Sequence, residues 1–325
     1  MTQRIGVLFG RADDSELIRI AEALNYESVW AAEGQGRTAF GKLERWATVT
    51  EKIGLATGIV NVFSRSPATL AQAIATLDDH SNGRAILGLG VAHPGVVEEF
   101  HGVQFNQPLD RMAEYVELVR RYLRGDPEGF EGQFFTPKRP HFWDGFKPVR
   151  ERVPIYNAAL GPGNIRLTGQ VADGWLPNLF PLEKLDEGLS WLETGAERAG
   201  RDVTDIDVAM YILVSVDDDP EAAYDRIAHH VAAYLRDIPG FYDRVASDAG
   251  FEESVSAAKA ASSTATAADA LPKPFLDLVG VAGSPETVRN ELGAIRAAGV
   301  DLPIVRAPIG ASLTEQRRLL RVCAP

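Results

Sequence analysis

The sequence predicts a closed (β/α)8 barrel, and three of its features support that fold class. Strand-like and helix-like segments alternate along nearly all of the 325 residues, eight of the segments are strand-like, and most of these are continuously apolar. Parallel strands that helices cover on both faces have this character. Eight such strands fit a barrel, and an open, doubly wound sheet is the rival architecture.

In the N-terminal half, Leu17, Ile18, Ala21 and Leu24 recur at helical spacing. Pro67 suits the first turn of another helix, and IGLATGIV at 53–60 has the β-branched residues of a strand. We expect strands at 4–9, 28–31, 53–60 and 84–89, and helices at 13–25, 41–52, 67–82 and 109–124.

The second half continues the alternation, and Ser284, Pro285 and Glu286 form a typical helix start. We expect strands at 154–159, 174–177, 206–216 and 302–307, and helices at 163–171, 182–199, 284–298 and 313–322. The length leaves open two domains or one large barrel, since barrels of this kind commonly exceed 200 residues. With the barrel interpretation, residues 1–325 form a single domain.

Two insertions interrupt the alternation. Residues 127–150 are rich in proline, glycine and aromatic residues, which predicts an ordered, hairpin-like excursion packed on the barrel rather than a linker. Residues 220–271, between the seventh and eighth strands, begin as a helix. The Ala/Ser/Thr tract at 257–268 is typical of a mobile segment.

Composition excludes several classes of function. The net charge is −12 with no basic block, which argues against a nucleic-acid partner. No apolar run is long enough for a transmembrane helix, and no signal-peptide pattern is present, so we expect a cytoplasmic protein away from membranes. The one cysteine, Cys323, excludes an intrachain disulfide and a CxxC motif.

Common catalytic motifs are also missing. GLGVAH at 88–93 is not a dinucleotide loop, because His93 stands where the third glycine is needed. There is no G-x-S-x-G or HExxH motif, and we expect no metal site. His229 and His230 cannot share one helix face, and both are expected to be exposed.

Function in a barrel belongs at the C-terminal ends of the strands, and five segments there resemble the bacterial luciferase-like superfamily. The similarity is greatest to the branch that uses the deazaflavin coenzyme F420. It extends over nearly the whole chain in order, through SVWAAEGQG (28–36), IGLATGIVNVFSRSP (53–67), GRAILGLGVAHPGVVEEFHG (83–102), IYNAALGPG (155–163) and ADGWLPNL (172–179). The resemblance implies a (β/α)8 barrel with an extended region between strands seven and eight, and by analogy a homodimer.

The resemblance also implies a coenzyme site. A cis peptide bond between Gly58 and Ile59 would lie behind the ring, and Val91, Ala92 and His93 would border it. The loop of Leu160, Gly161, Pro162 and Gly163 opens a helix and would seat the phosphate on backbone N–H groups. Asn61 and Asn178 are candidates for hydrogen bonds to ring or ribityl oxygens, and Glu33 would face the coenzyme.

Two positions depart from the sugar-phosphate dehydrogenases of that branch: Gly34 replaces a histidine, and His93 replaces a glutamate acid. His93 and Glu33 are our candidates for proton transfer, with His93 favoured because an imidazole titrates near neutral pH. A histidine that only lines the wall is the other interpretation. Arg306 is a candidate for holding an anionic substrate.

The resulting hypothesis is an F420-dependent oxidoreductase that exchanges hydride with a small organic molecule. Two alternatives stay open. One is an FMN-dependent monooxygenase of the same superfamily, and the other is a non-catalytic flavin-binding barrel.

Overall fold

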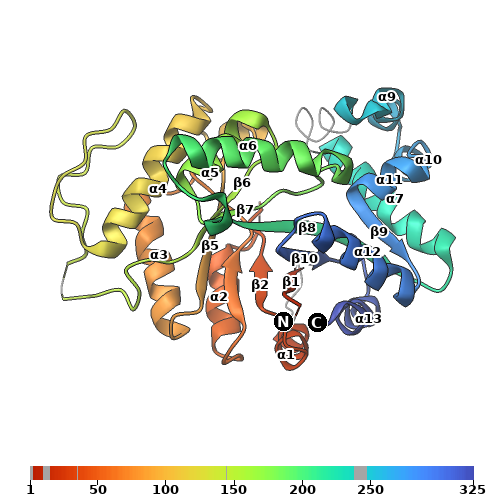
Figure 1. Ribbon diagram of the computed structural model, residues 1–325, viewed down its shortest axis with the longest axis horizontal. Coiled ribbons are helices and arrows are strands. Elements are labelled where there is room, and N and C mark those ends of the chain that lie inside the picture. The colour runs from red at the N-terminus through yellow and green to blue at the C-terminus, as the bar shows by residue number, and fades with distance from the viewer. Residues whose placement is uncertain (1–2, 10–14, 35, 144, 238–246) are drawn as a thin grey trace.

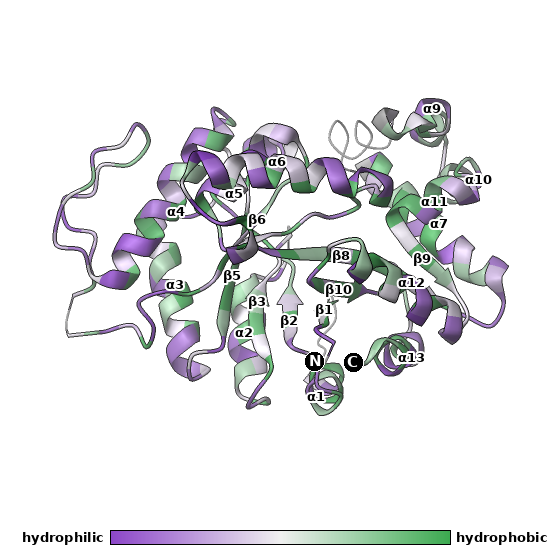
Figure 2. Cartoon of the chain, viewed as in Figure 1, coloured by the Kyte–Doolittle hydropathy of each residue, from purple (hydrophilic) through white to green (hydrophobic). Residues whose placement is uncertain are grey.

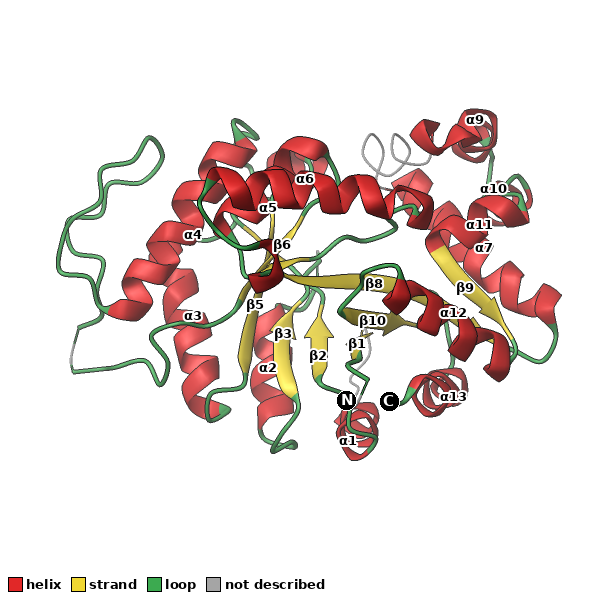
Figure 3. Ribbon diagram, in the orientation of Figure 1, coloured by secondary structure: helices red, strands yellow, loops and turns green. Residues whose placement is uncertain are grey.

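A computed structural model describes residues 3–9, 15–34, 36–143, 145–237 and 247–325. Its strands are parallel and run in the order β10-β1-β2-β3-β5-β6-β7-β8, and β8 pairs in turn with β10. That last pairing closes the sheet, with helices outside it (Figure 3). The (β/α)8 barrel is therefore confirmed, and the doubly wound alternative is wrong.

The strands have the expected positions, with one refinement. The third strand stops at Thr57 and resumes at Val60 on the other side of the Gly58–Ile59 bond. The strands are β1 (Gly6–Phe9), β2 (Ser28–Ala31), β3 (Gly54–Thr57), β4 (Val60–Asn61), β5 (Ala85–Gly90), β6 (Ile155–Ala158), β7 (Gly174–Trp175), β8 (Asp207–Val216), β9 (Gly280–Gly283) and β10 (Leu302–Arg306).

The barrel helices are α1 (Ser15–Ala23), α2 (Ala39–Ala47), α3 (Pro67–His80), α4 (Pro108–Arg124), α5 (Pro162–Val171), α6 (Leu185–Arg198), α12 (Pro285–Ala297) and α13 (Leu313–Cys323). Residues 13 and 14 of the first expected helix lie outside the described residues. Three of these helices begin on a serine cap: Ser66, Ser284 and Ser312 each accept a hydrogen bond from a backbone N–H three residues on.

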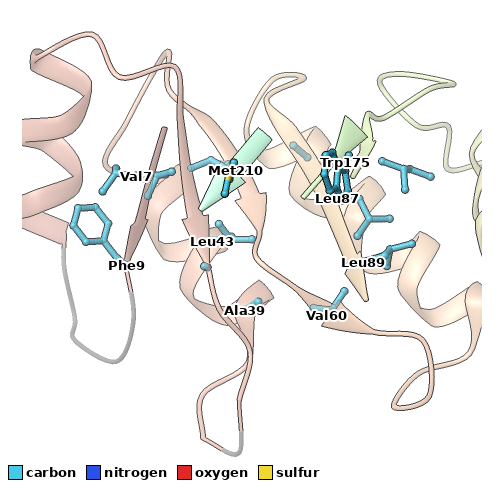
Figure 4. Packing of buried hydrophobic residues seen from close by; sticks show 14 of the residues in the cluster. Val7, Phe9, Ala39, Leu43, Val60, Leu87, Leu89, Trp175 and Met210 are labelled. Carbon is cyan, nitrogen blue, oxygen red and sulfur yellow. The ribbon is translucent and has the colours of Figure 1, made fainter. Parts of the chain in front are cut away.

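The core lies between the strands and the surrounding helices. Val7, Leu87 and Met210 from the strands and Leu43 from α2 belong to one buried hydrophobic cluster (Figure 4), and hydrophobic and hydrophilic segments alternate along the helices that cover the strands (Figure 2). Trp30 and Trp175 are fully buried. The Trp175 indole donates to the carbonyl of Ala159 at 2.8 Å, which fixes the start of the loop after β6.

The two insertions lie at opposite ends of the molecule (Figure 1). The first leaves α4 as a long excursion, and the backbone bonds Phe130 N to Pro137 O and Gly132 N to Phe135 O give it the expected hairpin character. Arg150 anchors its far end through a bidentate ion pair with the buried carboxylate of Asp78. Asp144, in the middle of this insertion, is outside the described residues.

The second insertion differs from expectation. It contains α7 (Pro220–Asp237), α9 (Glu252–Ala260), α10 (Thr264–Asp269) and α11 (Lys273–Val279), which share their own hydrophobic cluster, and residues 238–246 are outside the described part. The 257–268 tract is helical over much of its length, because its alanines pack against α7 and Ser263 caps α10. Strand β9, which pairs with the end of β8, was not predicted.

Candidate active site

Glycines bring β4 and β5 into close contact at their C-terminal ends. The Gly58–Ile59 peptide bond is cis, as the resemblance implied. A Cβ on Gly58 would collide with the Tyr211 hydroxyl, and one on Gly90 would lie 2.8 Å from Cδ1 of Ile59. Ile59 therefore sits directly against the bare backbone of β5, and both segments face the barrel mouth.

Hydrogen bonds between β6 and α5 hold the loop of residues 160–163 in place, and no atom lies close to the open side of Gly161. Asn157 in β6 donates to Asn164 and Thr168 of α5 at 3.0 and 2.9 Å, and Asn164 donates to the carbonyl of Ala158. Gly161, the N-cap residue of α5, has ordinary extended φ and ψ, no side-chain cap bond, and no atom near a Cβ placed on it. The first N–H groups of α5 are thus left without a side-chain cap at a rigid position.

Glu33, after β2, is already engaged. Its two carboxylate oxygens accept a bidentate pair of hydrogen bonds from Arg65 at 2.5 and 2.9 Å, and one of them also accepts from the N–H of Ala39. The ion pair raises the pKa of Arg65, although burial opposes the effect. The structure gives Glu33 the role of joining β2, α2 and the loop after β4. Gln35, in the same stretch, lies outside the described residues.

His93 has no such partner. It follows Ala92, whose φ of 57° is unusual for a residue with a side chain. Its carbonyl accepts from Val96 and Val97, while its ring nitrogens have no hydrogen-bond partner among the described residues. Burial lowers the pKa of His93, and Glu99 opposes this only in part. A neutral imidazole that can accept a proton is the result.

Asn61 is less available than the sequence suggested. Its Oδ1 accepts from the N–H groups of Phe63 and Ser64, at 3.0 and 2.8 Å, in a turn after β4. Its Nδ2 lies 3.4 Å from Nε2 of His101. Only the amide hydrogens of Asn61 remain for a ligand, and His101 is a mouth residue that the sequence interpretation missed.

A second polar group joins the end of β10 to the insertion. Arg306 donates to Oδ1 of Asn178 at 3.3 Å and to the hydroxyl of Tyr234 at 3.1 Å. Tyr234 and His230, one turn apart on α7, stack with ring centres 5.0 Å apart. Asn178 and Arg306 were predicted at this mouth. Tyr234 and His230 were not, because no sequence motif indicates how α7 packs against the barrel.

The expectation that His230 is exposed is wrong. It is fully buried, its Nδ1 accepts from the N–H of Ile309, and its Nε2 has no partner in the described part of the chain. Burial, aided by the nearby Arg306 charge, holds the pKa of His230 well below its usual value. His229 is exposed, as expected.

The structure therefore brings most predicted residues to one end of the barrel, in three linked groups. The groups are Ile59 with Gly58, Gly90 and the 91–93 turn, Glu33 with Arg65, and Asn178 with Arg306. Within the described ranges, no cluster of three or more His, Cys, Asp or Glu residues could hold a metal ion. No helix in those ranges is long and apolar enough to cross a membrane.

Comparison with known proteins gives relatives that span this chain. A family model described as luciferase-like monooxygenase matches residues 9–302. A Mycobacterium tuberculosis protein with a provisional assignment as a coenzyme F420-dependent oxidoreductase is 30% identical over 314 residues, covering 90% of each chain. The 5,10-methylenetetrahydromethanopterin reductase of Methanopyrus kandleri is 29% identical over 318 residues, covering 91% of this chain and 89% of its own.

Solved structures of related proteins have the same fold. The coenzyme F420-dependent tetrahydromethanopterin reductase of Methanopyrus kandleri superimposes with a TM-score of 0.85 at 26% identity, covering 100% of this chain and 98% of its own. An FMN-bound Baeyer–Villiger monooxygenase of Pseudomonas putida gives 0.76 at 18% identity, covering 100% and 97%, and shares the fold. The chain belongs to the luciferase-like monooxygenase family of enzymes.

Proposed function

We propose that this protein is an F420-dependent oxidoreductase that exchanges hydride between the deazaflavin and a small organic substrate at the C-terminal mouth of the barrel. The observation that supports it most directly is the loop of residues 160–163. Neither the backbone conformation at position 161 nor the space around it requires a glycine. Gly161 nevertheless precedes a helix N-terminus that has no side-chain cap. A phosphate on those N–H groups accounts for both facts. Two relatives whose names specify F420, the Mycobacterium tuberculosis protein and the reductase structure from Methanopyrus kandleri, support that coenzyme.

The remaining mouth residues fit a flat ring. In the proposal, Gly58, Ile59, Val91 and Ala92 form the surface behind and beside the ring. Ile59 can approach β5 only because residue 90 is glycine. Asn61 donates through its amide hydrogens, because its oxygen is used in the turn, and Asn178, whose Oδ1 accepts from Arg306, is a second proposed contact of the coenzyme. The deazaflavin supplies the hydride chemistry when it is bound.

His93 is the proposed proton-transfer residue. Its ring has no hydrogen-bond partner among the described residues, and burial favours the neutral form by lowering the pKa. A neutral imidazole accepts the proton that a hydroxyl substrate releases on oxidation. Glu33, by contrast, is proposed as a residue that orders Arg65 and α2 beside the coenzyme, because both its oxygens are already engaged.

Arg306 is proposed as a substrate contact. Its guanidinium is oriented by Asn178 and Tyr234 and lies over the Tyr234 ring, 5.3 Å from the ring centre. A cation held at one side of the mouth would bind an anionic group of the substrate. A homodimer and a single domain spanning residues 1–325 complete the proposal.

The test is a fluorescence titration of the dialysed protein with F420, FMN and FAD. We expect F420 to bind most tightly. Micromolar binding of FMN without binding of F420 would instead support the two-component monooxygenase. A non-catalytic binding barrel would be supported if F420 binds, if no alcohol, sugar phosphate or enone is turned over, and if His93→Ala leaves the binding of F420 unchanged.

A further inference from the structure

Arg111, in the first turns of α4, has an unusual environment. Its guanidinium carbon lies 4.8 Å from the ring centres of both Phe63 and Phe134, and 5.3 Å from that of Phe135. Phe63 comes from the turn after β4, and the other two rings come from the 127–150 excursion. Cation–π contacts with three rings hold the guanidinium in place.

The positive charge of Arg111 is not neutralised by any carboxylate in the described residues. Glu114, an acidic residue on the same helix, accepts hydrogen bonds from the N–H groups of Gln133 and Phe134. Burial lowers the pKa of Arg111, and Glu114 opposes this only in part. Farther along α4, Arg120 and Arg121 are paired with Asp173 and Glu117 at 3.1 and 2.9 Å.

The N–H groups of Arg111 are likewise unused. Its Nε is buried without a partner, and its terminal amino groups have no hydrogen bond within the described part of the chain. The side chain as a whole is only half-buried. Since aromatic rings pack against the guanidinium, its in-plane N–H groups remain for an oxyanion, and they match a carboxylate in a bidentate geometry.

The position of Arg111 links it to the mouth. Phe63 donates its N–H to Asn61, so the ring that contacts the guanidinium belongs to a proposed coenzyme-binding turn. Two residues before Arg111, the Leu109 side chain lies 3.2 Å from where a Cβ of Gly163 would be. Arg111 therefore stands beside both the ring-binding turn and the phosphate loop, on the helix that separates them from the excursion.

We propose that Arg111 binds an acidic group of the coenzyme beyond the phosphate on the 160–163 loop, namely a carboxylate of the F420 side chain. This inference rests on the proposed function. F420 carries carboxylates past its phosphate, whereas FMN ends at the phosphate, so an unneutralised, partly desolvated cation here favours F420 over FMN.

The experiment measures the affinity of F420 and of the ribityl deazaflavin, the fragment of F420 that lacks the phosphate and the acidic side chain, by fluorescence quenching. Arg111→Gln should weaken F420 about tenfold, as expected for loss of a charge-assisted hydrogen-bonded pair, and should leave the affinity of the ribityl deazaflavin unchanged. Arg111→Lys should give an intermediate loss, since it keeps the charge but not the planar fork. Arg121→Gln, on the same helix but paired with Glu117, is the matched control.

The outcomes separate the two proposals. If the wild type binds F420 and Arg111→Gln binds it equally well, the role of Arg111 is overturned and the proposed function stands. If both ligands weaken equally in Arg111→Gln, the arginine only shapes the mouth, and the inference is again wrong. If the wild type binds neither ligand, the proposed function fails, and this inference fails with it. Binding of the ribityl deazaflavin by each variant also shows that the variant is folded.

Discussion

The two ends of the barrel use the same kinds of residues in opposite ways. At the N-terminal end of the strands, Arg4 is paired with both Glu27 and Asp207, and Asp207 also accepts from the Tyr156 hydroxyl at 2.7 Å. Asp173 likewise joins Arg120 and Arg152. These charged groups satisfy one another, and such mutual pairing stabilises this end of the barrel.

The C-terminal mouth leaves similar groups unsatisfied within the described residues. His93 has no ring partner, Arg111 has no carboxylate, and α5 begins without a side-chain cap. Unused donors and charges cost stability, so a folded chain keeps them where a ligand will satisfy them. The contrast predicts that changes at the N-terminal end alter stability, whereas changes at the mouth alter binding and catalysis.

The largest expected effect is on catalysis. His93→Ala should lower kcat by roughly 100- to 10,000-fold, as is typical for loss of a general base, while F420 affinity and thermal stability change little. In the wild type, kcat should rise with pH and level off above a pKa lower than the usual histidine value of about 6.5, since burial lowers the pKa of His93.

The control for this variant is His80→Ala. His80 is an exposed histidine on α3 that pairs with Glu44, away from the mouth. Equal kcat values for His93→Ala and the wild type would mean that His93 only lines the wall.

The next effect is on stability. Asp207→Ala removes the shared acceptor of Arg4 and Tyr156 and should lower the free energy of unfolding by about 3 kcal/mol, measured by urea denaturation, without changing F420 affinity. Glu27→Ala removes a more exposed partner of Arg4 and should cost less than about 1 kcal/mol. A large loss of F420 affinity in Asp207→Ala would show that the two ends are coupled.

A third prediction concerns pH and the buried His230. Its folded pKa lies well below that of the unfolded chain, so the unfolded state binds the proton first as the pH falls below about 6.5. Wild-type stability should therefore fall as the pH drops below about 6.5, and His230→Phe should make that fall measurably smaller. His229→Phe, at the exposed neighbour, should leave the pH dependence unchanged, and equal slopes in all three proteins would contradict the burial of His230.

The smallest expected effect tests the phosphate loop. Gly161→Ala should fold at least as stably as the wild type, because its φ of −94° and the empty space around it accept a Cβ. F420 affinity should nevertheless fall about fivefold, as the methyl group keeps a phosphate away from the N–H groups of α5. Unchanged affinity would place the phosphate elsewhere.

Much of the site could be predicted because the ends of the strands are marked by residues that are close together in the sequence. The glycines of 88–90 and 161–163 stand next to apolar strands, and parallel strands in a barrel bring their C-terminal ends together whatever the loops contain. The partners of those residues could not be predicted, since Glu33 with Arg65, and Arg306 with Tyr234, pair across gaps of 32 and 72 residues.

By itself the sequence determined the alternation of eight apolar strands with helices, the family resemblance and the segments at the strand ends that form most of the mouth. These depend on local spacing and on residue type, which are visible along the chain. Only the tertiary structure decided that α7 buries His230, that the 257–268 tract is helical, and that the Arg111 charge is surrounded by rings rather than carboxylates. Each of these depends on which distant segments pack together, because burial and charge neutralisation come from neighbours in space and not from neighbours in sequence.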